Sequence, residues 1–252
     1  MARIVKTRPI GLTLADFEKG HLPEKRFIVK PGRKNARKIA RANPFIEGGY
    51  QTIATGPSTR AFALRHPGIS PKATRALIDD VASIRLRDVG PRLAQEAYSK
   101  QTAENIFRSR QIPVAYQEGK LPSGESYTYP AFGCNSQCVA LTAALRAKHI
   151  PAAFIRLFKG EGGVLGTVKG TSHAVVLFNL GGMKFIGDPF ERELEKRMLA
   201  FTPEMQERFA EMEKIGSLAV GRDAWDLGIT AYDHYHHIKK TSFFQSLAGK
   251  KG

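Results

Sequence analysis

The stretch GCNSQCVALTAALRAK, residues 133–148, is the clearest helical segment of the sequence. The apolar residues of one face recur at helical spacing: Cys134, Cys138, Leu141 and Leu145. Small residues between them allow neighbouring segments to pack closely, as a central core helix requires. Ile150-Pro151 ends the segment, because proline disfavours helical geometry in the residue before it. The sequence therefore predicts a core helix that begins at Cys134.

A second stretch, HAVVLFNLGGMKFIGD at residues 173–188, predicts two strands joined by a hairpin. The Gly181-Gly182 pair is typical of a two-residue turn. With that turn, Val175 opposes Asp188, and His173 lies on the same face of its strand as Val175. His173 and Asp188 then become diagonal neighbours, with backbones roughly 7–8 Å apart and side chains within reach. A three-residue turn would reverse this arrangement.

These residues together predict a thiol-enzyme site. Cys134 at a helix start would be the nucleophile, because the exposed N–H groups and partial positive charge there favour the thiolate. His173 would accept its proton, and Asp188 would hold the imidazole in one tautomer. The helix N–H groups would also stabilise an oxyanion. The alternative for Cys134 is an ordinary buried core cysteine.

The remaining thiol and histidines have simpler interpretations. Cys138 lies one turn deeper in the helix and is expected to pack in the core. An intrahelical disulfide has poor geometry, and a zinc site would need two more ligands. The C-terminal histidines could supply them but are expected to be solvated: His234, His236 and His237. We expect no metal and no cofactor.

Composition limits the class of protein. The chain has 252 residues, 42% of them hydrophobic, which is normal for a globular protein. Its longest apolar run is far shorter than the roughly 20 residues of a membrane helix, so we expect no membrane span. The first residues do not resemble a secretory signal. Two cysteines argue against a disulfide scaffold, so a cytoplasmic protein is the expectation.

Positive charge is concentrated near the N-terminus. Residues 1–70 hold 14 Lys and Arg against 4 Asp and Glu, which is +10 of the net charge of +16. The densest part is residues 30–41, KPGRKNARKIAR. Such a run is either a solvated basic face or a contact for a polyanion such as nucleic acid or an acidic protein. No nucleic-acid-binding motif accompanies it.

The pattern along the chain predicts an α+β fold in three segments. Residues 1–70 form a basic, partly irregular N-terminal extension, residues 71–200 a catalytic core, and residues 201–252 a helical segment that packs on that core. Helices are expected after the N-cap Ser70, over 92–108, and after Thr202-Pro203. The last of these should bury one side: Met205, Phe209, Met212 and Ile215. Residues 152–158 alternate as a strand, and the five-glycine loop at 160–170 is not a nucleotide-binding loop.

Four motifs resemble the transglutaminase-like superfamily. The family has a Gly-Cys or Gly-x-Cys helix start, a Leu-Arg-Ala-x-Gly-Ile-Pro-Ala helix exit, a His-Ala strand and an Asp-Pro strand end. This chain has Gly133-Cys134, Leu145-Arg-Ala-Lys-His-Ile-Pro-Ala152, His173-Ala174 and Asp188-Pro189. The cysteine-to-proline spacing matches only if Cys134 is the nucleophile. The resemblance covers about residues 95–195.

The resemblance implies a papain-like core, with the nucleophile helix on an antiparallel sheet and a Cys134–His173–Asp188 triad. It implies a cysteine-dependent amide hydrolase or acyltransferase that acts on protein or peptide amides through a thioester. Two positions depart from the family pattern: Val175 replaces an aromatic residue and His149 a glycine. Tyr127 or Tyr129 would either assist the oxyanion or pack. The alternative function is a non-catalytic scaffold that binds nucleic acid or an acidic partner through its basic region.

Overall fold

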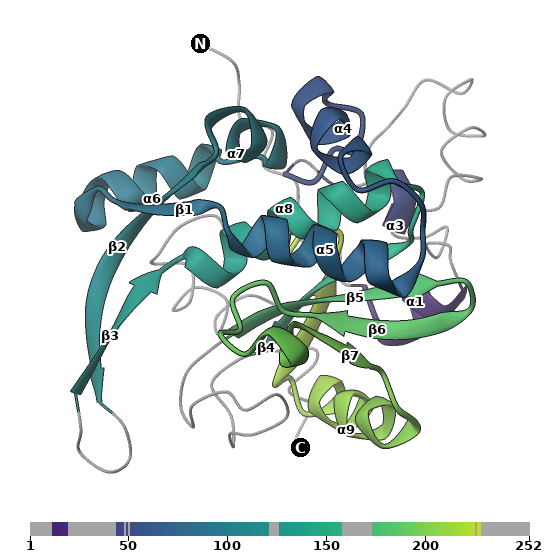
Figure 1. Ribbon diagram of the computed structural model, residues 1–252. Helices are drawn as coiled ribbons and strands as arrows, with labels where there is room; N and C mark the ends of the chain where they lie inside the picture. Colours follow the sequence, from purple (N-terminus) through teal and green to yellow (C-terminus); the bar gives the residue numbers. More distant parts are fainter. Residues whose placement is uncertain are drawn as a thin grey trace, which may run out of the picture.

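The computed structural model describes residues 12–19, 44–47, 49, 51–120, 126–157, 173–224 and 226–227. The basic run at 30–41, the glycine-rich loop at 160–170 and the three C-terminal histidines lie outside these residues. The division of the chain into three segments therefore stays a prediction. The described part is a mixed α+β structure, as expected (Figure 1).

A five-stranded sheet forms the centre of the molecule. Its strand order is β7-β6-β5-β4-β8, and every neighbouring pair is antiparallel. The strands are β4 (Ala152–Leu157), β5 (His173–Leu180), β6 (Met183–Gly187), β7 (Met198–Ala200) and β8 (Leu218–Gly221). Leu180 pairs with Met183 across Gly181 and Gly182, both at positive φ, so the predicted two-residue turn is confirmed.

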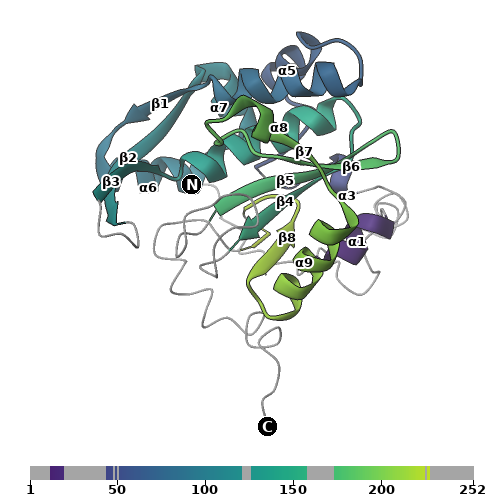
Figure 2. The ribbon, with the colours of Figure 1, turned by 60° about the horizontal axis from the view of Figure 1, so that its bottom comes forward.

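Helices cover both faces of this sheet, as Figure 2 shows. On one face lie α8 (Gly133–Ala147) and, beyond it, α5 (Pro71–Ala82); on the other lie α1 (Leu14–Lys19) and α9 (Pro203–Lys214). Successive strand residues point to opposite faces of the sheet and pack in two hydrophobic cores, one on each face. Phe154 and Val176 face α8, whereas Ile155 and Leu177 face α1 and α9. Helix α8 is buried on nearly all sides rather than along one stripe.

Two of the predicted helices begin at their predicted N-caps, whereas a third is divided into two helices. Ser70 and Thr202 cap α5 and α9 through their side chains. The helix expected over 92–108 is instead two helices, α6 (Gly90–Lys100) and α7 (Ala103–Ser109), because Gln101 and Thr102 are extended. Thr102 accepts the N–H of Asn105 and so caps the second helix. The prediction of one continuous helix is wrong for that reason.

A second sheet forms an arm that the sequence did not predict. Strands β1 (Arg85–Asp88), β2 (Gln111–Lys120) and β3 (Ser126–Ala131) lie in that order, with β1 parallel to β2 and β2 antiparallel to β3. Figure 1 shows the β2–β3 ribbon extending away from the rest of the molecule. One residue, Phe132, separates β3 from α8.

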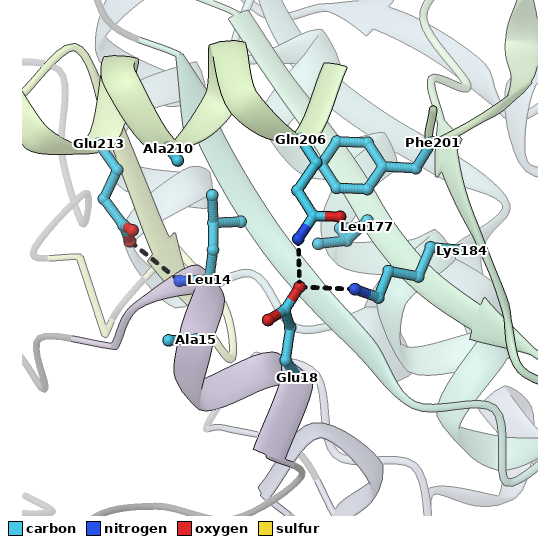
Figure 3. A pocket seen from close by; sticks show the side chains of 9 residues that line it. All are labelled: Leu14, Ala15, Glu18, Leu177, Lys184, Phe201, Gln206, Ala210 and Glu213. Atoms are coloured by element: carbon cyan, nitrogen blue, oxygen red, sulfur yellow. Dashed lines mark hydrogen bonds and ion pairs between the residues drawn. The ribbon is translucent and has the colours of Figure 1, made fainter. Parts of the chain in front are cut away.

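Parts of the N-terminal 70 residues belong to the core. Phe17 and Phe45 pack on the sheet, and Phe62 of α4 (Pro57–Leu64) packs near α8. Helix α1 is also fixed by polar contacts, shown in Figure 3. Glu18 accepts from Lys184 at 2.6 Å and from Gln206 at 2.8 Å, beside a cavity of about 170 Å³.

Arg146 joins an N-terminal segment to the end of α8. The side chain is 1% exposed, and its guanidinium donates to the carbonyl oxygens of Phe45 (2.8 Å) and Ala152 (2.6 Å) and to Thr52 Oγ1 (2.5 Å). Phe45 belongs to the short helix α3 (Pro44–Glu47). A buried guanidinium is stable only when its donors are satisfied, so these acceptors fix Phe45 and Thr52 against the core.

In α9, Phe209 is buried as expected, but Ile215 is 69% exposed. The expectation for Ile215 is wrong because the helix ends at Lys214 and Ile215 is its C-cap. The short 3-10 helix η2 (Leu194–Arg197) links β6 to β7. In the part of the chain that the structure describes, no helix has the length and apolar character needed to span a membrane.

Candidate active site

Cys134 lies in the first turn of α8. Phe132, the N-cap residue, has φ of 71°, a left-handed conformation that is uncommon outside glycine. Its ring stacks on buried Tyr98, with centroids 4.9 Å apart. The chain therefore turns sharply from β3 into α8, and the half-buried Cys134 follows at a helix N-terminus.

Gly133 allows the turn to pack under Phe190. A Cβ built on Gly133 would lie 2.7 Å from Phe190 Cε2, closer than real Cβ contacts. The Phe190 ring also lies 6.2 Å, centroid to centroid, from the imidazole of His173. Phe190 thus connects the segments that carry Cys134 and His173, and only glycine leaves room for it.

His173 and Asp188 form an ion pair. His173 Nε2 lies 2.6 Å from Asp188 Oδ2, and the two side chains are 12% and 6% exposed. The second carboxylate oxygen of Asp188 accepts the N–H of Phe190 at 3.0 Å. The N–H of Asp188 donates to the carbonyl oxygen of Arg197 at 2.8 Å. These bonds hold the carboxylate toward the imidazole, at the place that the hairpin register predicted.

Helix α8 brings Cys134 to the same end of β5. One turn further along the helix, Cys138 Sγ donates to the carbonyl oxygen of Ala174 at 3.1 Å. The imidazole of His173 acts on the Cys134 sulfur and lowers the pKa of its thiol. Because Nε2 contacts Asp188, Nδ1 is the ring nitrogen left for the sulfur. The structure thus brings together all three residues named from the sequence; their catalytic roles stay a prediction.

The electrostatics of the pair favour charge separation. Burial raises the pKa of the Cys134 thiol, but the hydrogen bond to His173 and the charges of His173 and Arg156 outweigh it and lower that pKa to about 7. Burial lowers the pKa of His173, but the charge and hydrogen bond of Asp188 outweigh it and raise that pKa to about 10. Between about pH 7 and pH 10 the thiolate and the imidazolium are therefore the predominant forms.

Sequence reasoning missed two polar residues beside the sulfur. Arg156 of β4 places Nη1 3.9 Å from Cys134 Sγ and donates to Asn135 Oδ1 at 2.7 Å. The available signal was an arginine in the otherwise apolar strand AAFIRL. Asn135 was overlooked because it follows the cysteine and reads as an ordinary first-turn residue.

The other residues considered from the sequence do not contact the Cys134 sulfur or lie outside the described residues. Cys138 is fully buried, and burial raises the pKa of its thiol, which is consistent with packing. Tyr129 donates its hydroxyl to Gln117 Oε1 at 3.0 Å within the arm. The side chain of Tyr127 is outside the described part. Among the described residues, no three His, Cys, Asp or Glu side chains are grouped to hold a metal ion.

Comparisons with known proteins add little. No family model matches the chain, and no curated protein matches it. A solved structure of a candidate cysteine protease from Cytophaga hutchinsonii is similar, with 15% identity and a TM-score of 0.44. The match covers 74% of this chain and 48% of that protein, so this chain spans about half of its length. A similarity of this size establishes neither a shared fold nor a shared activity.

Proposed function

We propose that the protein is a cysteine-dependent amide hydrolase or acyltransferase of the transglutaminase-like type, with a papain-like core. The observation that carries the proposal is the contact of His173 with Asp188 at 2.6 Å, while the same imidazole lowers the pKa of the Cys134 thiol at a helix start. A nucleophile, a base and a residue that orients the base are then in one chain of contacts.

The reaction follows from these contacts. In the ion pair His173 already holds the proton, and the Cys134 thiolate attacks the carbonyl carbon of a protein or peptide amide. The new S–C bond gives a tetrahedral oxyanion, which N–H groups in the first turn of α8 stabilise. His173 then protonates the leaving nitrogen, the C–N bond breaks and a thioester remains.

The second half of the reaction decides between hydrolysis and transfer. Water or an amine attacks the thioester while His173 removes its proton, and the S–C bond breaks to restore the thiolate. Asp188 stays ionised throughout and supports the imidazolium. No metal or cofactor is needed for either outcome.

The direct test is the pH dependence of iodoacetamide labelling of the native protein, with mass spectrometry to locate the modified cysteine. Fast labelling at Cys134 that persists below pH 7 and is lost in His173→Ala supports the proposal. The matched control is Cys138→Ala, which should label normally at Cys134. Turnover is then screened with glutamine-containing peptides, with release of ammonia measured in the presence and absence of an amine.

Two labelling results would refute the proposed nucleophile. Slow labelling of Cys134 with an ordinary thiol pKa near 8.5, or equal labelling of both cysteines, refutes an activated thiol. The non-catalytic scaffold would then be the better hypothesis.

We also propose that residues 30–41 contact a polyanion. Their charge supports this: six of the twelve residues are Lys or Arg. Binding to a single-stranded oligonucleotide should weaken steeply between low and physiological salt. Binding that is unchanged when these six Lys and Arg residues are replaced by Gln would contradict the proposed contact.

A further inference from the structure

Arg156 is an unusual residue for its position. It lies in β4, a strand whose six residues are all buried, and its own side chain is 8% exposed. Its neighbours across the sheet are small, Ala174 on β5 and Ala219 on β8. The small side chains leave room for the long arginine to extend over the sheet toward the first turn of α8.

The contacts of Arg156 point to the sulfur. Nη1 donates to Asn135 Oδ1 at 2.7 Å and lies 3.9 Å from Cys134 Sγ, within hydrogen-bond reach of sulfur. Asn135 follows Cys134 in the same helical turn, so the amide directs the guanidinium to the side of the turn that carries the sulfur. Arg146 shows the contrast, since its guanidinium binds carbonyl oxygens and a hydroxyl.

The charges around the sulfur explain why a second cation is useful. Among the described residues, the ionisable groups that interact with Cys134 come from five places: His173 of β5, Asp188 after β6, Arg156 of β4, Cys138 of α8 and Tyr98 of α6. Asp188 supports the imidazolium but opposes the thiolate. Arg156 offsets that repulsion, and the thiolate, carboxylate, imidazolium and guanidinium sum to zero.

We propose that Arg156 is a charge partner of the Cys134 sulfur, positioned by Asn135, so that two cations stabilise the thiolate. This inference rests on the proposed role of Cys134 and adds a residue to it. His173 must release its proton to the leaving group, whereas arginine keeps its charge throughout. The fixed cation therefore keeps the sulfur a good leaving group when the thioester is resolved.

The test is the pH dependence of iodoacetamide alkylation at Cys134 in purified full-length variants, with thermal unfolding as a check on folding. In Arg156→Met the inflection should rise by about one pH unit, less than in His173→Ala, because an opposite charge at this range is lost while the imidazolium remains. Arg156→Lys should restore part of the shift, since the charge remains but the planar fork does not. Asn135→Ala should raise the inflection less than Arg156→Met does.

The outcomes separate this inference from the proposed function. An inflection in Arg156→Met equal to that of the wild type overturns the role of Arg156, even if His173→Ala shifts it. If Arg156→Met does not fold, wild-type inflections in both Arg156→Lys and Asn135→Ala overturn it instead. If His173→Ala leaves Cys134 alkylation unchanged, the proposed Cys–His pair fails. A merely structural arginine would change the unfolding temperature without moving the inflection.

Discussion

Replacing Asp188 with Asn should dismantle the ion pair of the candidate site while leaving its shape. The amide side chain occupies the same volume as the carboxylate. Its oxygen still accepts the N–H of Phe190, which in the wild type donates to Asp188 Oδ1. It removes the negative charge that lies 2.6 Å from His173 Nε2. The imidazolium then loses the interaction that raises its pKa to about 10, and burial drives that pKa to its ordinary value near 6.5 or below.

The effect on Cys134 can be sized from the same values. With a neutral imidazole the thiol loses its main cation, and its pKa rises from about 7 toward an ordinary value of about 8.5. At pH 6 the thiolate fraction, and with it the alkylation rate, should fall by up to about 30-fold. At pH 10 both proteins hold a full thiolate, so their alkylation rates should be equal.

The assay is iodoacetamide alkylation across this pH range, together with an NMR titration of the His173 ring. Stability gives an independent readout. His173 has a folded pKa above its unfolded value, so its contribution is fully present below about pH 6.5 and is lost as pH rises through about 10. The stability difference between wild type and variant should follow that window. A folded Asp188→Asn protein that alkylates at pH 6 within about threefold of wild type would refute the reasoning.

Three further predictions concern backbone and packing. Gly133→Ala should lower the free energy of unfolding by about 1–3 kcal/mol and slow Cys134 alkylation, because the new Cβ would lie 2.7 Å from Phe190 Cε2. Adding Phe190→Leu should restore part of the stability and part of the alkylation rate. If neither is restored, the clash is not the cause. His149→Gly should raise the free energy of unfolding by about 0.5–1 kcal/mol in urea titrations, because the exposed His149 has a φ of 59°, which glycine adopts without strain. His149→Ala is the control. An equal gain in stability from alanine would show that the positive φ is not the cause. Tyr98→Phe should raise the unfolding temperature by a few degrees, about 1 kcal/mol, because the buried hydroxyl of Tyr98 has no hydrogen-bond partner among the described residues. A lower unfolding temperature would mean that the hydroxyl is satisfied.

Local signals in the sequence predicted much of the central sheet and two of its helices. The Gly181-Gly182 turn fixes the register of β5 and β6 by itself, so the approach of His173 to Asp188 followed from the spacing. Ser70 and Thr202 cap their helices through local hydrogen bonds that involve only residues next to them. Such features depend on few residues and no tertiary context.

Features that depend on distant segments were missed. Pairing of β1 with β2 is parallel and spans an intervening pair of helices, so no turn residue signals it. The left-handed φ of Phe132 is stabilised by packing on Tyr98, which the sequence does not reveal. Arg156 was not singled out from the sequence, because its partner Asn135 comes from another element. His149 adopts the conformation for which the resembling family often uses glycine.

The position of Arg146 has a consequence for the design of truncated proteins. Composition suggested that the first 70 residues are an extension, so a fragment of residues 71–200 would be a natural choice for expression. Such a fragment would delete two acceptors of a fully buried guanidinium, the carbonyl oxygen of Phe45 and the hydroxyl of Thr52. The carbonyl oxygen of Ala152 would still accept from the guanidinium, but each buried donor left without an acceptor costs about 1–3 kcal/mol, a large part of the stability of a typical domain. We therefore expect the shortest autonomous folding unit to begin before residue 44.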